Sequence, residues 1–229
     1  MKLAFIVLLL GLASCAYKMC TMWQEIKDMD CLAALFDVFL FRGYKEACKV
    51  DKNAKPNFEK CNTAKSGACA FYITPVSKCE ATSVVTDFCK EVVEGSGKRF
   101  AIIVDVADPP HWSSETATNR AYMEALIAAL NARTSDCVYW VAILTSKWEW
   151  EKIFGADYTG MSGLRLMWEF IDRNPEFDPE TFVNFGGWTK PFAKMFDRNL
   201  DACENGVDAV TWGIAREEDT LDMVAPIDE

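Results

Sequence analysis

Four apolar runs recur along the chain without the polar alternation of a half-exposed strand. They lie at residues 37–41, 69–74, 100–106 and 138–144. Continuous runs of this length are typical of parallel strands that are covered on both faces. The pattern therefore predicts a buried, parallel sheet.

Helical patterns lie between these runs. Residues 115–133 place apolar side chains at helical spacing, among them Tyr122 and Leu126, which predicts a helix with one apolar stripe. Weaker helical patterns cover residues 49–65 and 83–93. Strands that alternate with helices in this way predict β/α units.

The pattern changes after about residue 164, where no long helical stripe follows. Four short apolar segments remain, at residues 164–170, 181–185, 192–196 and 207–212, separated by loops that contain Pro and Gly. We interpret the chain as a barrel-like α/β fold whose last strands are joined without full helices. No internal repeat or low-complexity linker divides it, so we expect one domain.

The N-terminus has the pattern of a cleaved secretory signal. Lys2 precedes an apolar core at residues 3–12, and small residues follow at 13–16. The apolar core is shorter than the roughly 20 residues that a membrane span needs. We therefore predict a signal peptide at residues 1–16 and a secreted protein. The alternative is a bacterial lipobox in which Cys15 is lipidated.

After the signal, we expect one extracellular domain at residues 17–213 and an acidic, loosely held tail at residues 214–229. The formal net charge of the whole chain is −10. This acidity argues against nucleic acid or an anionic membrane as a partner.

Nine cysteines remain when Cys15 is removed with the signal, and an exported protein uses them for disulfides first. Seven fall between Cys20 and Cys89, so we expect the N-terminal third to be the most cross-linked. We expect Cys137 to be the unpaired one, because the run after it predicts a buried strand where a thiol packs as a small apolar group. The absence of CxxC spacing and the single histidine, His111, give little support to a zinc site. No cofactor is expected.

Several segments, taken in order, resemble one family. WSSETATNRAYMEALIAAL, LTSKWEWEKIFG, NFGGWTKPFAKMF and CENGVDAVTW are similar to the C-terminal half of family 25 glycoside hydrolases, the Chalaropsis-type muramidases, in their invertebrate branch. FLFRGYKE and the segment up to AFYITP extend the resemblance over nearly the whole mature chain. It implies a modified TIM-like barrel of five β/α units followed by three strands with few helices. It also implies hydrolysis of the bond between muramic acid and glucosamine in peptidoglycan.

The chemistry of this family needs two acids at the mouth of the barrel. Residues two apart on a strand point to the same side, so an Asp-x-Glu motif places both carboxyls over one sugar. One protonates the leaving oxygen, and the other stabilises the charge that develops at the anomeric carbon. At the matching position this chain has Asp105, Val106 and Ala107. The resemblance therefore implies that the general acid has been replaced by alanine.

Other site positions can be compared with the residues that the family has there, and some differ while others are the same. The first-strand segment YKMCTMW lacks the family's aspartate, and Leu144 stands where the family has a tyrosine. Asp208 matches the family's last-strand aspartate, so Asp105 and Asp208 are the retained candidate site residues. Each has a structural alternative, which for Asp105 is the capping of the next turn. Glu169 lies where the family has a small residue and is the candidate replacement acid.

Several aromatic side chains are expected to serve packing rather than chemistry. Trp188, in the turn FGGWTKP, is expected to pack and not to form a sugar platform, because aromatic residues contribute mainly through buried area. Trp148 and Trp150 lie on the helix expected after residue 144, and both are expected in the core. His111 is expected in a surface loop.

Three functions stay open from the sequence. The first is a secreted, catalytically degenerate lysozyme-like protein that binds peptidoglycan or a related glycan, in an innate-immune or digestive context. The second is an active muramidase that uses Asp105 with a relocated acid, either Glu169 or Asp108. The third is a disulfide-stapled scaffold for an unidentified protein partner.

Overall fold

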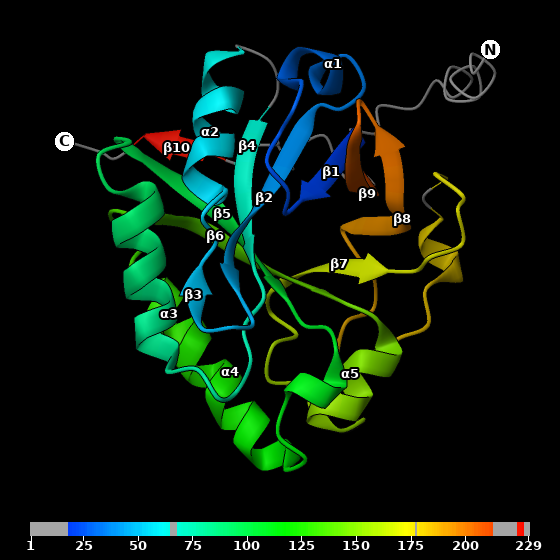
Figure 1. Cartoon of the computed structure of the whole chain (residues 1–229). Coiled ribbons are helices and arrows are strands. Elements are labelled where there is room, and N and C mark those ends of the chain that lie inside the picture. Colours follow the sequence, from blue (N-terminus) through cyan, green and yellow to red (C-terminus); the bar gives the residue numbers. More distant parts are fainter. Residues whose placement is uncertain (1–17, 65–67, 177, 213–223, 227–229) are drawn as a thin grey trace.

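The computed structural model describes residues 18–64, 68–176, 178–212 and 224–226 (Figure 1). Within these ranges, eight strands close into a barrel. Neighbours from β1 to β8 are parallel, whereas β9 runs antiparallel to both β8 and β1. In order around the barrel they are β1 (Lys18–Met22), β2 (Val38–Lys45), β4 (Ala68–Ile73), β5 (Lys98–Asp105), β6 (Val138–Thr145), β7 (Arg165–Glu169), β8 (Ala193–Ala202) and β9 (Asn205–Trp212).

Helices connect the first six strands of the barrel and lie on its outside (Figure 1). They are α1 (Met29–Ala33), α2 (Ala54–Thr63), α3 (Ala81–Phe88), which the π-helix η2 (Cys89–Val93) continues, α4 (Thr116–Asn131) and α5 (Lys147–Phe154). Shorter elements are β3 (Lys49–Val50), β10 (Val224–Pro226) and the 3-10 turns η3 (Pro109–His111) and η4 (Pro179–Thr181). Five β/α units are therefore followed by three strands, as the family resemblance implies.

The strands are apolar on both faces because the barrel has two cores. On β5, Ile102 and Val104 pack toward the helices, whereas Ala101 and Ile103 alternate with them and fill the barrel. Packed side chains thus occupy the interior, as in other closed barrels of eight strands. The inner cluster consists of Met19, Val38, Leu40, Ala70, Tyr72, Ala101, Ile103, Ala142, Leu144, Met167, Ala193 and Met195.

The apolar segment at residues 181–185 is not a strand of the barrel, contrary to its interpretation as one of the short final elements. Only Phe185 pairs, in an isolated bridge to Trp188. Phe182 packs against Trp168 of β7, with ring centroids 5.3 Å apart. Phe185 packs in turn against Phe182 and Trp188, so the aromatic side chains of this segment are buried without joining the barrel.

The chain ends are described only in part. The predicted signal peptide at residues 1–16 and Cys15 lie outside the described residues, as does most of the tail at 214–229. Three tail residues, Val224–Pro226, form β10 and pair antiparallel with Lys98–Phe100 of β5. No helix in the described ranges is long and apolar enough to cross a membrane.

Four disulfides join described residues, and the expected unpaired cysteine is wrong. Cys137 lies just before β6 beside η2, where it pairs with Cys89. The unpaired cysteine of the described residues is Cys20, which is fully buried on β1. The pairs are Cys31–Cys203, Cys48–Cys79, Cys61–Cys69 and Cys89–Cys137.

The disulfides are also spread more widely than the cysteine spacing suggests. Two pairs stay within the N-terminal third, whereas Cys89–Cys137 reaches β6 and Cys31–Cys203 reaches the turn between β8 and β9. Spacing alone does not reveal which cysteines meet across a barrel.

Candidate active site

The three candidate acids meet at the carboxyl-terminal mouth of the barrel. Asp105 ends β5 and Glu169 ends β7, and by alternation each lies on the same face as the barrel-filling residues of its strand. Asp208 on β9 accepts a hydrogen bond from the Thr21 hydroxyl at 3.4 Å. Glu169 raises the pKa of Asp105, and Asp208 contributes to raising that of Glu169, because the negative charges act on one another.

Asp105 is partly exposed, and its carboxyl has no hydrogen-bond partner among the residues that the structure describes. Burial, and after it the charge of Glu169, raise the pKa of Asp105 well above its usual range, while Arg198 opposes them. Asp105 therefore holds its proton at pH values where an ordinary aspartate is ionised. It does not cap the following turn in this structure, which was the alternative role.

Ala107 lies two residues after Asp105. Strand β5 ends at Asp105, Ala107 is buried, and its carbonyl accepts a hydrogen bond from Trp112 Nε1 at 3.0 Å. Asp108 then takes a left-handed conformation with φ of 54° and is exposed. The chain thus turns away from the barrel without placing a second carboxyl beside Asp105 on the same strand.

Arg198 is a site residue that the sequence analysis missed. The pairing of β8 with β9 is irregular between Met195 and Leu200, and Asn199 has φ of 55°. Irregularities of this kind re-aim a side chain. Arg198 Nη2 donates to Glu169 Oε2, and the backbone N–H of Asn199 donates to Asp208 Oδ1 at 3.0 Å. No motif in the sequence marks this bulge.

Glu149 also contributes to the electrostatics of the mouth. It lies in the first turn of α5, and its carboxylate accepts hydrogen bonds from the backbone N–H and the hydroxyl of Ser146 at 3.2 and 2.8 Å. Burial raises the pKa of Glu169, Glu149 raises it further, and Arg198 opposes both. Ser146 and Glu149 form a capping box, so Glu149 also fixes the start of α5.

Tyr72 on β4 is the other residue that the sequence analysis missed. It is 6% exposed and belongs to the cluster that fills the barrel. Burial, followed by the charge of Asp105, raises the pKa of Tyr72 well above its usual range. Arg42 lies near it, but Arg42 Nε donates to Asp51 Oδ2 at 2.8 Å. The apolar run predicted a strand here without showing that a phenol reaches the mouth.

Trp188 and the glycine pair before it form a packed turn. Trp188 is 4% exposed, its Nε1 donates to the carbonyl of Leu164 at 2.8 Å, and its ring lies 4.8 Å from that of Trp150. A Cβ on Gly186 would lie 2.6 Å from the Trp188 ring, and Gly186 has φ of 57°. Packing is therefore the role of Trp188, as expected, and His111 is exposed, also as expected.

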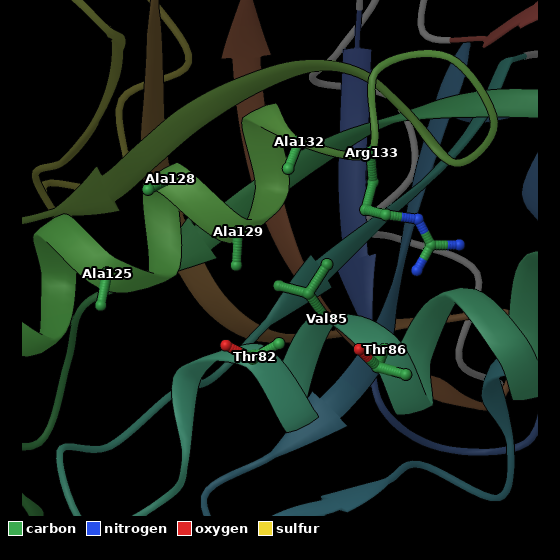
Figure 2. Close-up of a pocket in the computed structure, with 8 residues that line it drawn as sticks. All are labelled: Thr82, Val85, Thr86, Ala125, Ala128, Ala129, Ala132 and Arg133. Carbon is green, nitrogen blue, oxygen red and sulfur yellow. The ribbon is translucent and has the colours of Figure 1, made fainter.

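A groove of about 350 Å³ lies away from these acids, between α3 and α4 on the helical layer (Figure 2). Small side chains of α4 form one of its sides, and it contains none of the candidate acids. The lining residues are Thr82, Val85, Thr86, Ala125, Ala128, Ala129, Ala132 and Arg133. In the described part of the chain, no group of three His, Cys, Asp or Glu side chains is arranged to hold a metal ion.

Replacing Asp105 by Asn is expected to stabilise the fold at neutral pH. The folded pKa of Asp105 is raised above the unfolded value, so the proton favours the folded state at low pH. The stability that the proton contributes is lost as the pH rises from about 4 through the folded pKa. Because Asn carries no charge, the variant should gain about 0.5 to 2 kcal/mol at pH 8 and little at pH 3, measured by urea unfolding.

Asp157→Asn is the control for this measurement. Arg120 hydrogen-bonds to Asp157 and lowers its pKa, so the charged form of this exposed residue is favoured in the fold. That variant should gain nothing at pH 8. Equal stability of Asp105→Asn and the native chain at pH 8 would contradict the assignment of Asp105 as a destabilising charge.

Solved structures show which class of barrel this is. A family GH25 lysozyme from Aspergillus fumigatus aligns with a TM-score of 0.70 at 12% identity, covering 86% of this chain and 94% of that one. A bacterial lysozyme from Streptomyces coelicolor aligns with a TM-score of 0.68 at 13% identity, covering 87% and 93%. The fold is therefore that of the family 25 lysozymes.

Sequence comparisons show which family the chain belongs to. A family model described as Lysozyme-like protein 1 matches residues 16–196. Lysozyme-like protein 5 of Caenorhabditis elegans is 26% identical over 176 residues, which cover 76% of this chain and 79% of the relative. Probable GH family 25 lysozyme 4 of Dictyostelium discoideum is 24% identical over 186 residues, covering 81% and 84%. The chain belongs to the lysozyme-like protein family of the family 25 lysozymes, as the motifs indicate.

Proposed function

We propose that this chain is a secreted lysozyme-like protein that has lost muramidase catalysis and binds peptidoglycan or a related glycan at the mouth of its barrel. The observation that carries the loss of catalysis is Ala107, two residues after Asp105. Glycoside hydrolysis of this type needs a proton donor and a second carboxylate on either side of the scissile bond. Here the second carboxylate is missing from the strand that holds Asp105.

The other acids near the mouth are not placed to act as the proton donor. Glu169 forms an ion pair with Arg198, which favours its ionised form and partly offsets the burial that raises its pKa. Asp208 accepts hydrogen bonds from Thr21 and Asn199. Asp108 is exposed. None of these residues replaces a glutamate at position 107.

An active muramidase is the second candidate function. Burial raises the pKa of both Asp105 and Glu169, and raised carboxyl pKa values are a feature of proton donors in glycosidases. In this alternative Asp105 acts with Glu169 as the relocated acid. The ion pair of Glu169 with Arg198 makes this the weaker proposal.

Secretion is part of the proposal. It rests on the signal peptide predicted at residues 1–16 and on the four disulfides, which form and persist in oxidising compartments. A peptidoglycan ligand in a secreted protein fits a role in innate immunity or in the digestion of bacteria.

The test is loss of turbidity of bacterial cell walls across acidic to neutral pH, with the native chain and an Ala107→Glu variant. The native chain should be at least about a hundredfold slower than an active family 25 lysozyme, because a positioned acid supplies that much. Comparable rates would refute the loss of catalysis and favour the second candidate. Activity in the variant alone would show that only the proton donor is missing.

Binding is tested separately by sedimentation with insoluble peptidoglycan. Retention of the native chain is expected, and a variant with Trp148 replaced by Ala serves as a control for exposed apolar surface. Failure to sediment would refute glycan binding. The remaining hypothesis would then be a disulfide-stapled scaffold that binds a protein partner.

A further inference from the structure

The first residues of β5 have a backbone edge that β4 does not use. The two strands pair in parallel only over Ile102–Val104 of β5. β4 itself begins at Ala68 and pairs there with β2, whereas residues 98–101 of β5 pair with no described residue of β4. One edge of β5 is therefore available at the amino-terminal end of the barrel, opposite the end where the candidate acids lie.

A segment from far along the chain uses this edge. β10 lies antiparallel to β5, with Ala225 opposite Arg99 (Figure 1). The N–H of Phe100 donates to the carbonyl of Cys137 at 2.9 Å, on the side of β6. Neighbouring residues of a strand direct their backbone groups to alternate edges, so those of Arg99 face β10. Arg99 and Ala225 are therefore the hydrogen-bonded pair of this short ladder.

The pairing is short enough to be reversible. It ends at Pro226, which has no N–H to donate to a ladder. Residues 213–223 connect β10 to β9, and a tether of this length keeps its segment at an effective concentration of about millimolar order. A contact made by so few hydrogen bonds has a dissociation constant of about the same order. The docked and released forms of the segment are therefore close in free energy.

Charge indicates which kind of segment fits this edge. The paired stretch of β5 contributes Lys98 and Arg99 and no acid. The sequence around β10 is acidic, with Asp222 before it and Asp228 and Glu229 after it. Opposite charges near a surface attract one another modestly, whereas like charges repel. The edge therefore favours an acidic segment over a basic one.

We propose that residues 98–101 of β5 form an acceptor site for an acidic, extended peptide segment, and that this chain occupies the site with its own residues 224–226. The binding mode is strand addition, in which main-chain hydrogen bonds supply the affinity. A partner segment with the same charge pattern gains access when residues 224–226 are released. The site and the candidate acids lie at opposite ends of the barrel, so this inference does not depend on the proposed function.

Amide hydrogen exchange of the full chain tests whether residues 224–226 occupy the site. The Arg99 amide is compared in the native chain, in Ala225→Pro and in Ala215→Pro. Ala225→Pro removes the N–H opposite Arg99, so exchange at Arg99 should be about fivefold faster. Ala215→Pro is the matched control, because it makes the same change outside the paired residues. It should leave the exchange at Arg99 within about twofold of the native rate.

A synthetic peptide of residues 220–229 tests the acceptor site from outside the chain. NMR titration measures its dissociation constant. Ala225→Pro leaves the site open, so it should bind the peptide about fivefold more tightly than the native chain, in which residues 224–226 compete. A second peptide with Asp222→Asn, Asp228→Asn and Glu229→Gln should bind about threefold more weakly than the first.

Each part of the inference has a result that would overturn it. Equal exchange at Arg99 in the native chain and Ala225→Pro would overturn occupancy by residues 224–226. A native dimer that Ala225→Pro dissociates would overturn occupancy within one chain. Absence of peptide binding to Ala225→Pro would overturn the acceptor site, and equal affinities of the two peptides would overturn the preference for an acidic segment.

The fold of Ala225→Pro is checked in the same exchange experiment. The amide of Ile143, which is buried on β6, should exchange as slowly as in the native chain. The native chain, titrated with peptide above the effective concentration of its own tail, tests the acceptor site without any substitution.

Discussion

Replacing Cys31 and Cys203 together by Ala is expected to lower the free energy of unfolding by about 5 kcal/mol. The two cysteines are separated by 172 residues, and in the chain-entropy account a disulfide restricts the unfolded state more as its loop lengthens. The matched control is the double variant of Cys61 and Cys69, which are separated by only 8 residues. That pair should cost about 2.5 kcal/mol.

Urea unfolding without reducing agent measures both double variants against the native chain. A typical domain has only about 5 to 15 kcal/mol of stability, so loss of Cys31–Cys203 is expected to leave a marginal fold. Equal effects of the two double variants would show that loop length does not set the contribution of Cys31–Cys203.

Trp150→Ala is expected to cost about 3 to 5 kcal/mol, the usual range for truncating a buried tryptophan. Trp150 is fully buried, and its ring packs 4.5 Å from that of Phe154 and 4.8 Å from that of Trp188. Its Nε1 also donates to the carbonyl of Tyr158 at 3.1 Å. The truncation therefore opens a cavity and leaves a buried carbonyl without its donor.

Trp148→Ala is the control for Trp150→Ala, because the two residues share helix α5. Trp148 is 60% exposed, so its removal should change the stability by less than about 0.5 kcal/mol. Thermal or urea unfolding of the two variants checks both values. Similar losses in both would mean that Trp148 is covered in solution.

The two tryptophans show where reading the sequence succeeds and fails. Both were expected in the core, which is correct for Trp150 and wrong for Trp148. Residues two apart on a helix point in nearly opposite directions, so one face of α5 cannot bury both. The strand runs were predicted more reliably, because residues such as Ile102 and Ile103 are buried on opposite faces of one strand, and only a sheet covered on both sides permits that.

The candidate site was predictable only where a motif marks it. Asp105 and Ala107 stand in a recognisable strand segment, so the sequence alone shows an alanine two residues after Asp105. Arg198 is not, because its position depends on an irregular pairing of β8 that no residue pattern specifies. The pairing of Cys137 with Cys89 was not predicted because it also depends on tertiary structure. The two cysteines lie together only when η2 packs beside the start of β6.

Cys20 is an unpaired thiol among described residues that also contain four disulfides. A thiolate attacks disulfides, and repeated attack would scramble the native pairing. Cys20 is fully buried on β1, and burial, followed by the charge of Asp208, raises the pKa of its thiol. As long as the barrel stays closed, little of the Cys20 thiolate forms, and it cannot reach a disulfide. Closure of the barrel thus protects the cross-links that in turn stabilise it.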